Sequence, residues 1–200
     1  MAGISARVFR ISFSGELAFE INVSADEGVA LWESLMEAGS EYDITPYGTE
    51  TMHVLRAEKG YVIVGQDTDG SVTPADLGME WIVSKTKDFI GKRSLVRSDM
   101  LRENRKQLVG LVTDQSQKVL PEGTQLVNEP STDYPVPMTG HVTSSYYSSI
   151  LGRSIALALV KGGHSRLGAS VYAPTLDGKL IEAIITSPVF YDPENRLHKT

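Results

Sequence analysis

Two glutamates four residues apart are the feature of this sequence best suited to ligand chemistry. Glu16 and Glu20 lie in a segment with the pattern of a strand, with Ala18 between them. Side chains alternate between the two faces of a strand, so both carboxylates are expected on one face. Glutamate is uncommon in strands, and a carboxylate on an inward face must be paired or must bind a ligand. Its oxygens can accept parallel hydrogen bonds from an N–H and an adjacent amino group, as on the edge of a pterin or a guanine. The alternative, which these residues alone favour, is two solvated side chains on an edge strand.

Arg56 is a second candidate for binding, in the run Leu55–Gly60. Its guanidinium could anchor an anionic tail of a ligand. The alternative is the C-terminus of a helix, where cations stabilise the helix dipole. The residues alone favour this second interpretation.

Signatures of catalysis are scarce. The sequence has no cysteine, which excludes disulfides, thiolate metal sites, cysteine nucleophiles and cysteinyl-linked flavins. It also lacks a Gly-rich dinucleotide loop, a phosphate loop and a G-x-S-x-G elbow. The run Asp67–Gly70 is similar to the start of a calcium loop but has no glutamate at the twelfth position, so we predict a turn. Four scattered histidines lack metal-binding spacing and are predicted to be structural, namely His53, His141, His164 and His198.

Composition places the chain among ordinary globular proteins. It has 200 residues, of which 41% are hydrophobic and 22% charged. The net charge of −6 disfavours nucleic acid as a partner. No apolar run approaches the ~20 residues of a membrane span, and the N-terminus has no signal-peptide pattern. We therefore expect a cytoplasmic protein with no membrane partner.

The first half of the sequence alternates between strand and helix signals. Its order is strand, strand, helix, helix, strand, which favours a two-layer α+β sheet. A tight turn at Ser14–Gly15 should join the first two strands, and a capping box at Ser24–Glu27 should open the first helix. The expected elements are strands over Arg7–Phe13 and Leu17–Val23, a helix with apolar residues from Val29 to Met36, a helix over Thr49–Lys59, and a buried strand over Tyr61–Val64.

The second half predicts an antiparallel barrel or sandwich of short strands. The acidic excess lies in the first half, and the charged run near Leu101–Gln107 marks the expected boundary between domains 1–103 and 104–200. The run Ile155–Val160 has no polar residue, so both its faces should be buried. Strands are expected at Gln107–Val112, Gln125–Asn128, Gly140–Ser144, Ile155–Val160, Ser170–Ala173 and Leu180–Thr186.

Several motifs in order resemble one known family. The chain is similar, from Arg7 to Tyr191, to the folate-binding aminomethyltransferases, which include the glycine-cleavage T-protein and the C-terminal part of the α subunit of heterotetrameric sarcosine oxidases. The first motif follows the family's T-G-E-x-G-x-E-I and the second its L-R-L-E-A-G. The matching segments are Phe13–Ile21, Leu55–Gly60, Gly65–Asp69, Thr73–Pro74, Trp81, Phe89–Lys92, Gly140–Ser144 and Leu151–Ala158.

The resemblance assigns roles that the residues alone do not. It implies that Glu20 recognises the pterin ring of tetrahydrofolate, that Glu16 is the first glutamate of that motif, and that Arg56 and Trp81 lie near the folate pocket. It also implies an α+β fold, with part of a ferredoxin-like folate domain followed by a small β-barrel. Met52 departs from the family, since many T-proteins carry an arginine there.

The resemblance also implies the chemistry of a larger enzyme. The family's catalytic aspartate lies upstream of the first motif and has no counterpart before Arg7, so we expect a fragment that is inactive in isolation and contains no catalytic residue. In the full complex, FAD, FMN and NAD are expected in other domains or subunits. This chain is expected to bind tetrahydrofolate, which captures the one-carbon unit of sarcosine as methylenetetrahydrofolate. Its expected partners are the other sarcosine oxidase subunits, and no metal is expected. The alternative is a non-catalytic folate-binding or assembly module of the same fold.

Overall fold

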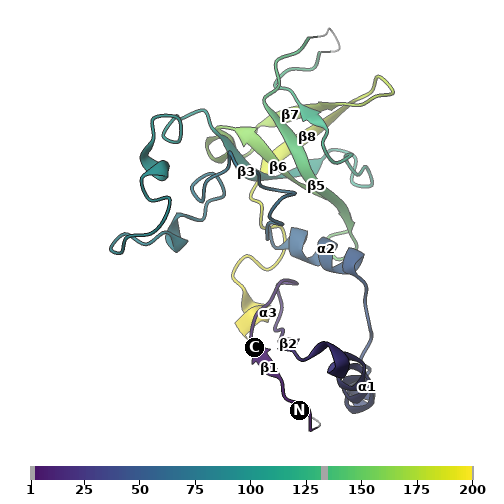
Figure 1. Cartoon of the computed structure of the whole chain (residues 1–200). Coiled ribbons are helices and arrows are strands. Elements are labelled where there is room, and N and C mark those ends of the chain that lie inside the picture. The colour runs from purple at the N-terminus through teal and green to yellow at the C-terminus, as the bar shows by residue number, and fades with distance from the viewer. Residues whose placement is uncertain (1–2, 132–134, 200) are drawn as a thin grey trace. The chain divides into compact units, whose positions relative to one another are not determined.

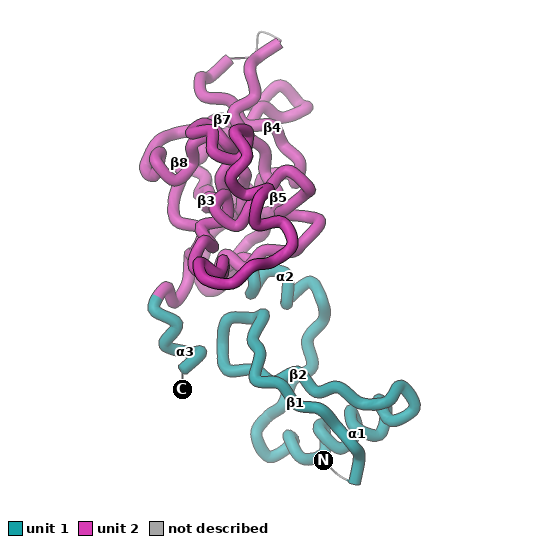
Figure 2. Tube along the Cα trace, turned by 60° about the vertical axis from the view of Figure 1, so that its left-hand side comes forward, with its two compact units in different colours: residues 1–56, 194–200 teal, residues 57–193 magenta. Residues whose placement is uncertain are grey.

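The computed structural model describes residues 3–131 and 135–199 and divides the chain into two compact units. Unit 1 comprises residues 1–56 and 194–200, and unit 2 comprises residues 57–193. Figure 2 shows the two units in different colours. The domain boundary expected near residue 103 stays a prediction.

Unit 1 contains a short antiparallel sheet and helices. Strand β1 (Arg7–Phe9) pairs with β2 (Glu20–Asn22), with Val8 opposite Ile21. Both strands are shorter than predicted, because residues 10–19 form a long connection in place of a tight hairpin turn. Within this connection Gly15 adopts a φ of 92°, which favours glycine, and its N–H donates to Ser12 Oγ at 2.9 Å.

The helices of unit 1 confirm two predictions and correct one. Helix α1 (Gly28–Gly39) follows the 3₁₀ turn η1 (Ala25–Glu27), and η2 (Ser40–Tyr42) comes after it. Ser24 makes no side-chain cap bond, so the predicted capping box is wrong; its carbonyl accepts from Glu27 N at 3.0 Å instead. Helix α2 (Thr49–Glu58) begins where predicted, and the short helix α3 (Arg196–Lys199) lies near the chain's end (Figure 1).

Residues Tyr61–Val64 do not form the predicted strand. The chain reverses directly after them, because Asp67 N donates to the carbonyl of Ile63 at 2.9 Å and Asp67 Oδ2 accepts from Ile63 N at 2.8 Å. Val64 makes just an isolated bridge to Thr68. The apolar run is therefore the first arm of a loop, and the predicted turn at 67–70 is confirmed as part of it.

Unit 2 is built around a six-stranded antiparallel sheet in the order β4-β5-β6-β3-β8-β7. Val127, just after β4, exchanges two backbone hydrogen bonds of 2.9 Å with Tyr172 of β7, which joins the outer strands and closes the sheet. The predicted barrel and the α+β class are thus confirmed. The strands are β3 (Lys106–Thr113), β4 (Gln125–Leu126), β5 (Gly140–Ser148), β6 (Arg153–Lys161), β7 (Ser170–Pro174) and β8 (Leu180–Thr186).

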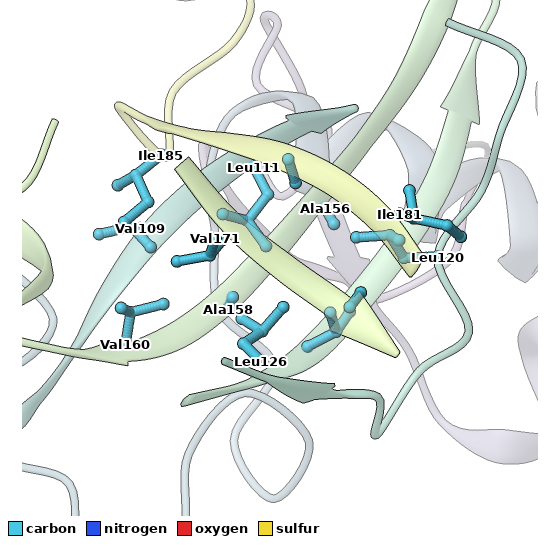
Figure 3. Close-up of a cluster of buried hydrophobic side chains, with 13 residues drawn as sticks. Val109, Leu111, Leu120, Leu126, Ala156, Ala158, Val160, Val171, Ile181 and Ile185 are labelled. Atoms are coloured by element: carbon cyan, nitrogen blue, oxygen red, sulfur yellow. The ribbon is translucent and has the colours of Figure 1, made fainter. Parts of the chain in front are cut away.

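Strand β6 is buried on both faces, as predicted. Ala156, Ala158 and Val160 point into the barrel core, which Figure 3 shows. Leu157 and Leu159 alternate with them and pack with Leu108 on the outer face, beneath partly buried side chains that include Val62, Val72, Leu77 and Phe190. The segment after α2 therefore covers one outer face of the barrel.

Among the described residues, no helix has the length and apolar character needed to cross a membrane.

Candidate functional site

Glu20 opens strand β2 of unit 1, and its side chain is exposed. Asn22, two residues along the same strand, donates from Nδ2 to Glu20 Oε1 at 3.1 Å. Alternation along the strand places these two side chains on one face. Within the described residues Oε2 of Glu20 has no hydrogen-bond donor, so the carboxylate retains accepting capacity toward a ligand.

Glu16 lies outside the strand. Strand β2 begins at Glu20, and Glu16 falls in the irregular connection directly after the turn at Gly15. The argument that alternation puts Glu16 and Glu20 on one face is therefore wrong. Both side chains are exposed, which agrees with the solvated side chains that the residues alone favoured, and neither is an inward carboxylate.

Arg56 is completely buried in the last turn of α2. Its position agrees with the helix C-terminus that the residues alone favoured, and its complete burial is a feature that the sequence did not predict.

The charged residues after Arg56 hold unit 2 together internally. Glu58 Oε1 accepts from Ser148 Oγ of β5 at 2.6 Å, and the Glu58 carbonyl accepts from Phe190 N at 2.8 Å. Lys59 Nζ donates to the carbonyl of Asp192 at 2.6 Å and lies 3.3 Å from its Oδ2. The end of the motif Leu55–Gly60 therefore ties the chain to both β5 and the segment after β8.

Trp81 belongs to unit 2, in the 3₁₀ turn η3 (Glu80–Ile82), and is 81% exposed. A tryptophan buries a large apolar area when it is covered, so this degree of exposure fits a side chain that contacts a ligand or another protein surface. Of the four predicted site residues, Glu16, Glu20 and Arg56 belong to unit 1 and Trp81 to unit 2.

The sequence predicted a turn at Asp67 but not the hydrogen bonds that its side chain makes to β5. Asp67 is fully buried, and its Oδ1 accepts from the hydroxyls of Thr143 and Ser144 on β5, each at 2.6 Å. The register of β5 shifts between Val142 and Ser144, which is a β-bulge at Thr143. The adjacent Gln66 donates from Nε2 to the Thr143 carbonyl at 3.2 Å. The sequence signals were a carboxylate beside a run of apolar residues and the family match over Gly65–Asp69, and neither identifies the distant hydroxyls.

The histidines show no metal site. Within the described ranges no group of three His, Cys, Asp or Glu side chains is arranged to hold a metal ion. His164 Nε2 lies 3.2 Å from the carbonyl of Leu108, which agrees with a structural role. Burial, together with the charge of Lys106, lowers the pKa of His141.

Two domain families match this architecture. The GCVT N-terminal domain matches residues 1–87, and the glycine cleavage T-protein C-terminal barrel domain matches residues 106–192. These two matches, one after the other along the chain, define a T-protein-like module, and the chain belongs to the glycine-cleavage T-protein family.

Individual relatives sharpen this assignment. The chain is 54% identical over 195 residues to sarcosine oxidase subunit alpha of Corynebacterium sp. strain P-1, covering 96% of this chain and 20% of that protein. It is 32% identical to the aminomethyltransferase of Thermotoga petrophila, covering 96% of this chain and 50% of that protein. The crystal structure of aminomethyltransferase T from Bartonella henselae superposes with a TM-score of 0.79 at 25% identity, covering 93% of this chain and 50% of that one. The resemblance found in the motifs is confirmed, and the chain spans about a fifth of the length of its sarcosine oxidase relatives.

Proposed function

We propose that the chain supplies part of a tetrahydrofolate site in the T-protein-like portion of a sarcosine oxidase α subunit. The observation that carries the proposal is the combination of both T-protein domains with 54% identity to sarcosine oxidase subunit alpha along nearly the whole chain. The 43% identity to the sarcosine oxidase subunit alpha of Rhizobium meliloti supports the same assignment.

Glu20 has the properties that a pterin requires. Its carboxylate is exposed on β2, is held by Asn22 through Oε1, and accepts nothing at Oε2 from the described residues. A carboxylate in this state can accept from the ring N–H and the amino group of a pterin, and charge-assisted hydrogen bonds of this kind are the strong ones. Arg56, Trp81 and Glu16 are proposed as further folate-binding residues, on the basis of the family motifs in which they lie.

The reaction assigns this chain a positioning role. A flavin held outside this chain would supply the oxidation of the N-methyl group of sarcosine to an imine. When bound, tetrahydrofolate supplies the nitrogens that take up the one-carbon unit as methylenetetrahydrofolate. The residues of this chain hold the pterin in one orientation and so convert an encounter of two molecules into a reaction between positioned groups.

The remaining parts of the proposal concern the larger assembly. We place the FAD, FMN and NAD sites and the catalytic aspartate outside this chain, and the other sarcosine oxidase subunits are its proposed partners. Residues 1–103 form the proposed folate-domain portion, and residues 104–200 form the proposed barrel domain.

Titration of the chain with tetrahydrofolate tests the assignment of Glu20. Glu20→Gln keeps the size of the side chain but removes its charge, so the affinity should fall by about tenfold or more. Glu33→Gln, an exposed glutamate of α1, is the matched control and should bind as the parent chain does. Equal affinity of the parent chain and Glu20→Gln would reject the assignment.

A further inference from the structure

A small polar pocket lies on the outer face of the barrel, where β3 begins and β6 ends. Its volume is about 270 Å³, and its walls include Lys106, His141, Lys161 and the loop at Asp69 and Ser71. Leu159 contributes to the lining, and this side chain belongs to the outer apolar cluster and not to the barrel core. The pocket lies wholly within unit 2.

Two lysines face each other across the sheet at this pocket. Lys106, the first residue of β3, is directly opposite Lys161, the last residue of β6. Like charges at directly opposed positions of an antiparallel pair destabilise it. Lys161 is exposed, and its ammonium has no acceptor within the part of the chain that the structure describes. The arrangement therefore leaves a positive charge that a bound anion would offset.

The carboxylates around the pocket are already engaged. Asp76 accepts from Arg105 Nε at 2.9 Å, and Asp99 pairs with Arg102. Asp69 Oδ1 accepts from the N–H and the hydroxyl of Ser71 at 2.8 and 2.6 Å. The charges within the two arginine–aspartate pairs therefore cancel. The combined positive charge of Lys106 and Lys161 exceeds the single negative charge of Asp69.

His141 adds a neutral donor. Its Nδ1 lies 3.3 Å from Lys106 Nζ. Burial and the neighbouring Lys106 lower the pKa of His141, so the ring is neutral at pH 7. A neutral ring that accepts from Lys106 at Nδ1 carries its proton at Nε2 and can donate from there.

We propose that this pocket binds a small oxyanion, a phosphate or a carboxylate group, between the ammonium groups of Lys106 and Lys161 and the Nε2–H of His141. The pocket shares no residue with the proposed folate site, and this proposal does not depend on that one. Its ligand chemistry follows from two cations and one neutral donor in the lining of one polar pocket.

The test is an NMR titration of the full chain with inorganic phosphate and, separately, with acetate. Ionic strength is held constant with sodium chloride, so that general screening does not change. Saturable movement of the His141 ring signals is expected, with an upward shift of its pKa, while His53, His164 and His198 serve as internal references. The tighter of the two anions identifies whether phosphate or carboxylate is the preferred group.

Variants of Lys161 separate a specific site from general attraction. Lys161→Ala should weaken binding by about tenfold, and Lys161→Arg should restore most of it. Lys85→Ala, which removes an exposed lysine outside the pocket, should bind within about twofold of the parent. Absence of saturation at His141 with both anions, or equal weakening by Lys161→Ala and Lys85→Ala, would overturn the proposal.

Discussion

The two units differ most in what they bury. Unit 2 encloses a continuous core of leucine, isoleucine, valine and alanine side chains from all the barrel strands (Figure 3). Within the described part of unit 1, Leu31 has the one buried apolar side chain. Phe19, Trp32 and Tyr47 of unit 1 are each more than half exposed. Hydrophobic burial is the main favourable term in folding, so the barrel core should contribute far more to stability than the small core of unit 1.

The proposed binding function belongs to the unit that buries less. The proposed pterin contact lies in the unit with the smaller core, on a two-stranded sheet that is marginal without further support. Regions that bind ligands are often drawn from the less stable parts of a protein.

Truncation of the barrel core should produce the largest loss. Leu111 of β3 is 1% exposed within the core, and Leu111→Ala should lower the free energy of unfolding by about 3 kcal/mol. Val29→Ala in α1, where the side chain is 70% exposed, should change it by less than about 0.5 kcal/mol. Urea denaturation measures both, and similar losses for the two variants would show that the units do not differ as described.

The buried ion pair in unit 2 should give a loss that depends on pH. Burial alone would raise the pKa of Asp76, but hydrogen bonds from Arg105 and Thr73 outweigh it and hold the pKa below its usual value. Stability from this group is therefore complete above the unfolded pKa near 4 and is lost as the pH falls through the lower folded pKa.

Asp76→Asn removes that titration. It should lower the free energy of unfolding by about 3 kcal/mol at pH 7, because it removes the closer of the two carboxylates beside the mostly buried Arg105 side chain. The difference from the parent chain should shrink as the pH falls below about 4. Denaturation curves at several pH values check this, and a difference independent of pH would contradict the assignment.

Close packing around Gly110 in the barrel predicts a smaller loss of unfolding free energy. A Cβ at Gly110 of β3 would lie 2.3 Å from the Ser187 carbonyl oxygen and 2.7 Å from the ring of Phe190, so Gly110→Ala should cost about 2 kcal/mol. Gly28, the first residue of α1, has open space at this position and a φ of −60°. Gly28→Ala should instead stabilise the chain by about 0.5 kcal/mol. Thermal unfolding of the two variants should therefore shift in opposite directions, and a shift of both in one direction would be inconsistent with this packing.

The sequence predicted the barrel far better than the first unit. Leu180–Thr186 was predicted to the residue, and the wholly apolar run Ile155–Val160 correctly indicated burial on both faces. These signals succeed because alternation and continuous apolar runs report directly on burial. The run Tyr61–Val64 misled because the buried Asp67 carboxylate binds the backbone at Ile63 and forms a loop.

The proposed site residues rest on the family motifs and not on strand periodicity. Strand periodicity placed Glu16 beside Glu20, but the turn at Gly15 and the late start of β2 prevent this. The burial of Arg56 and the partners of Asp67 depend on residues far away in the sequence, which local patterns do not report. The family motif alone distinguished Glu20 from other exposed glutamates.

Amide hydrogen exchange with and without tetrahydrofolate tests the central claim most directly. The account predicts slow exchange in β3 and β6 that folate leaves unchanged, and faster exchange in β2 that folate slows. The slowing should be weaker in Glu20→Gln than in Glu33→Gln. Exchange in β2 that folate does not alter, or that it alters equally in both variants, would contradict the proposed role of this unit.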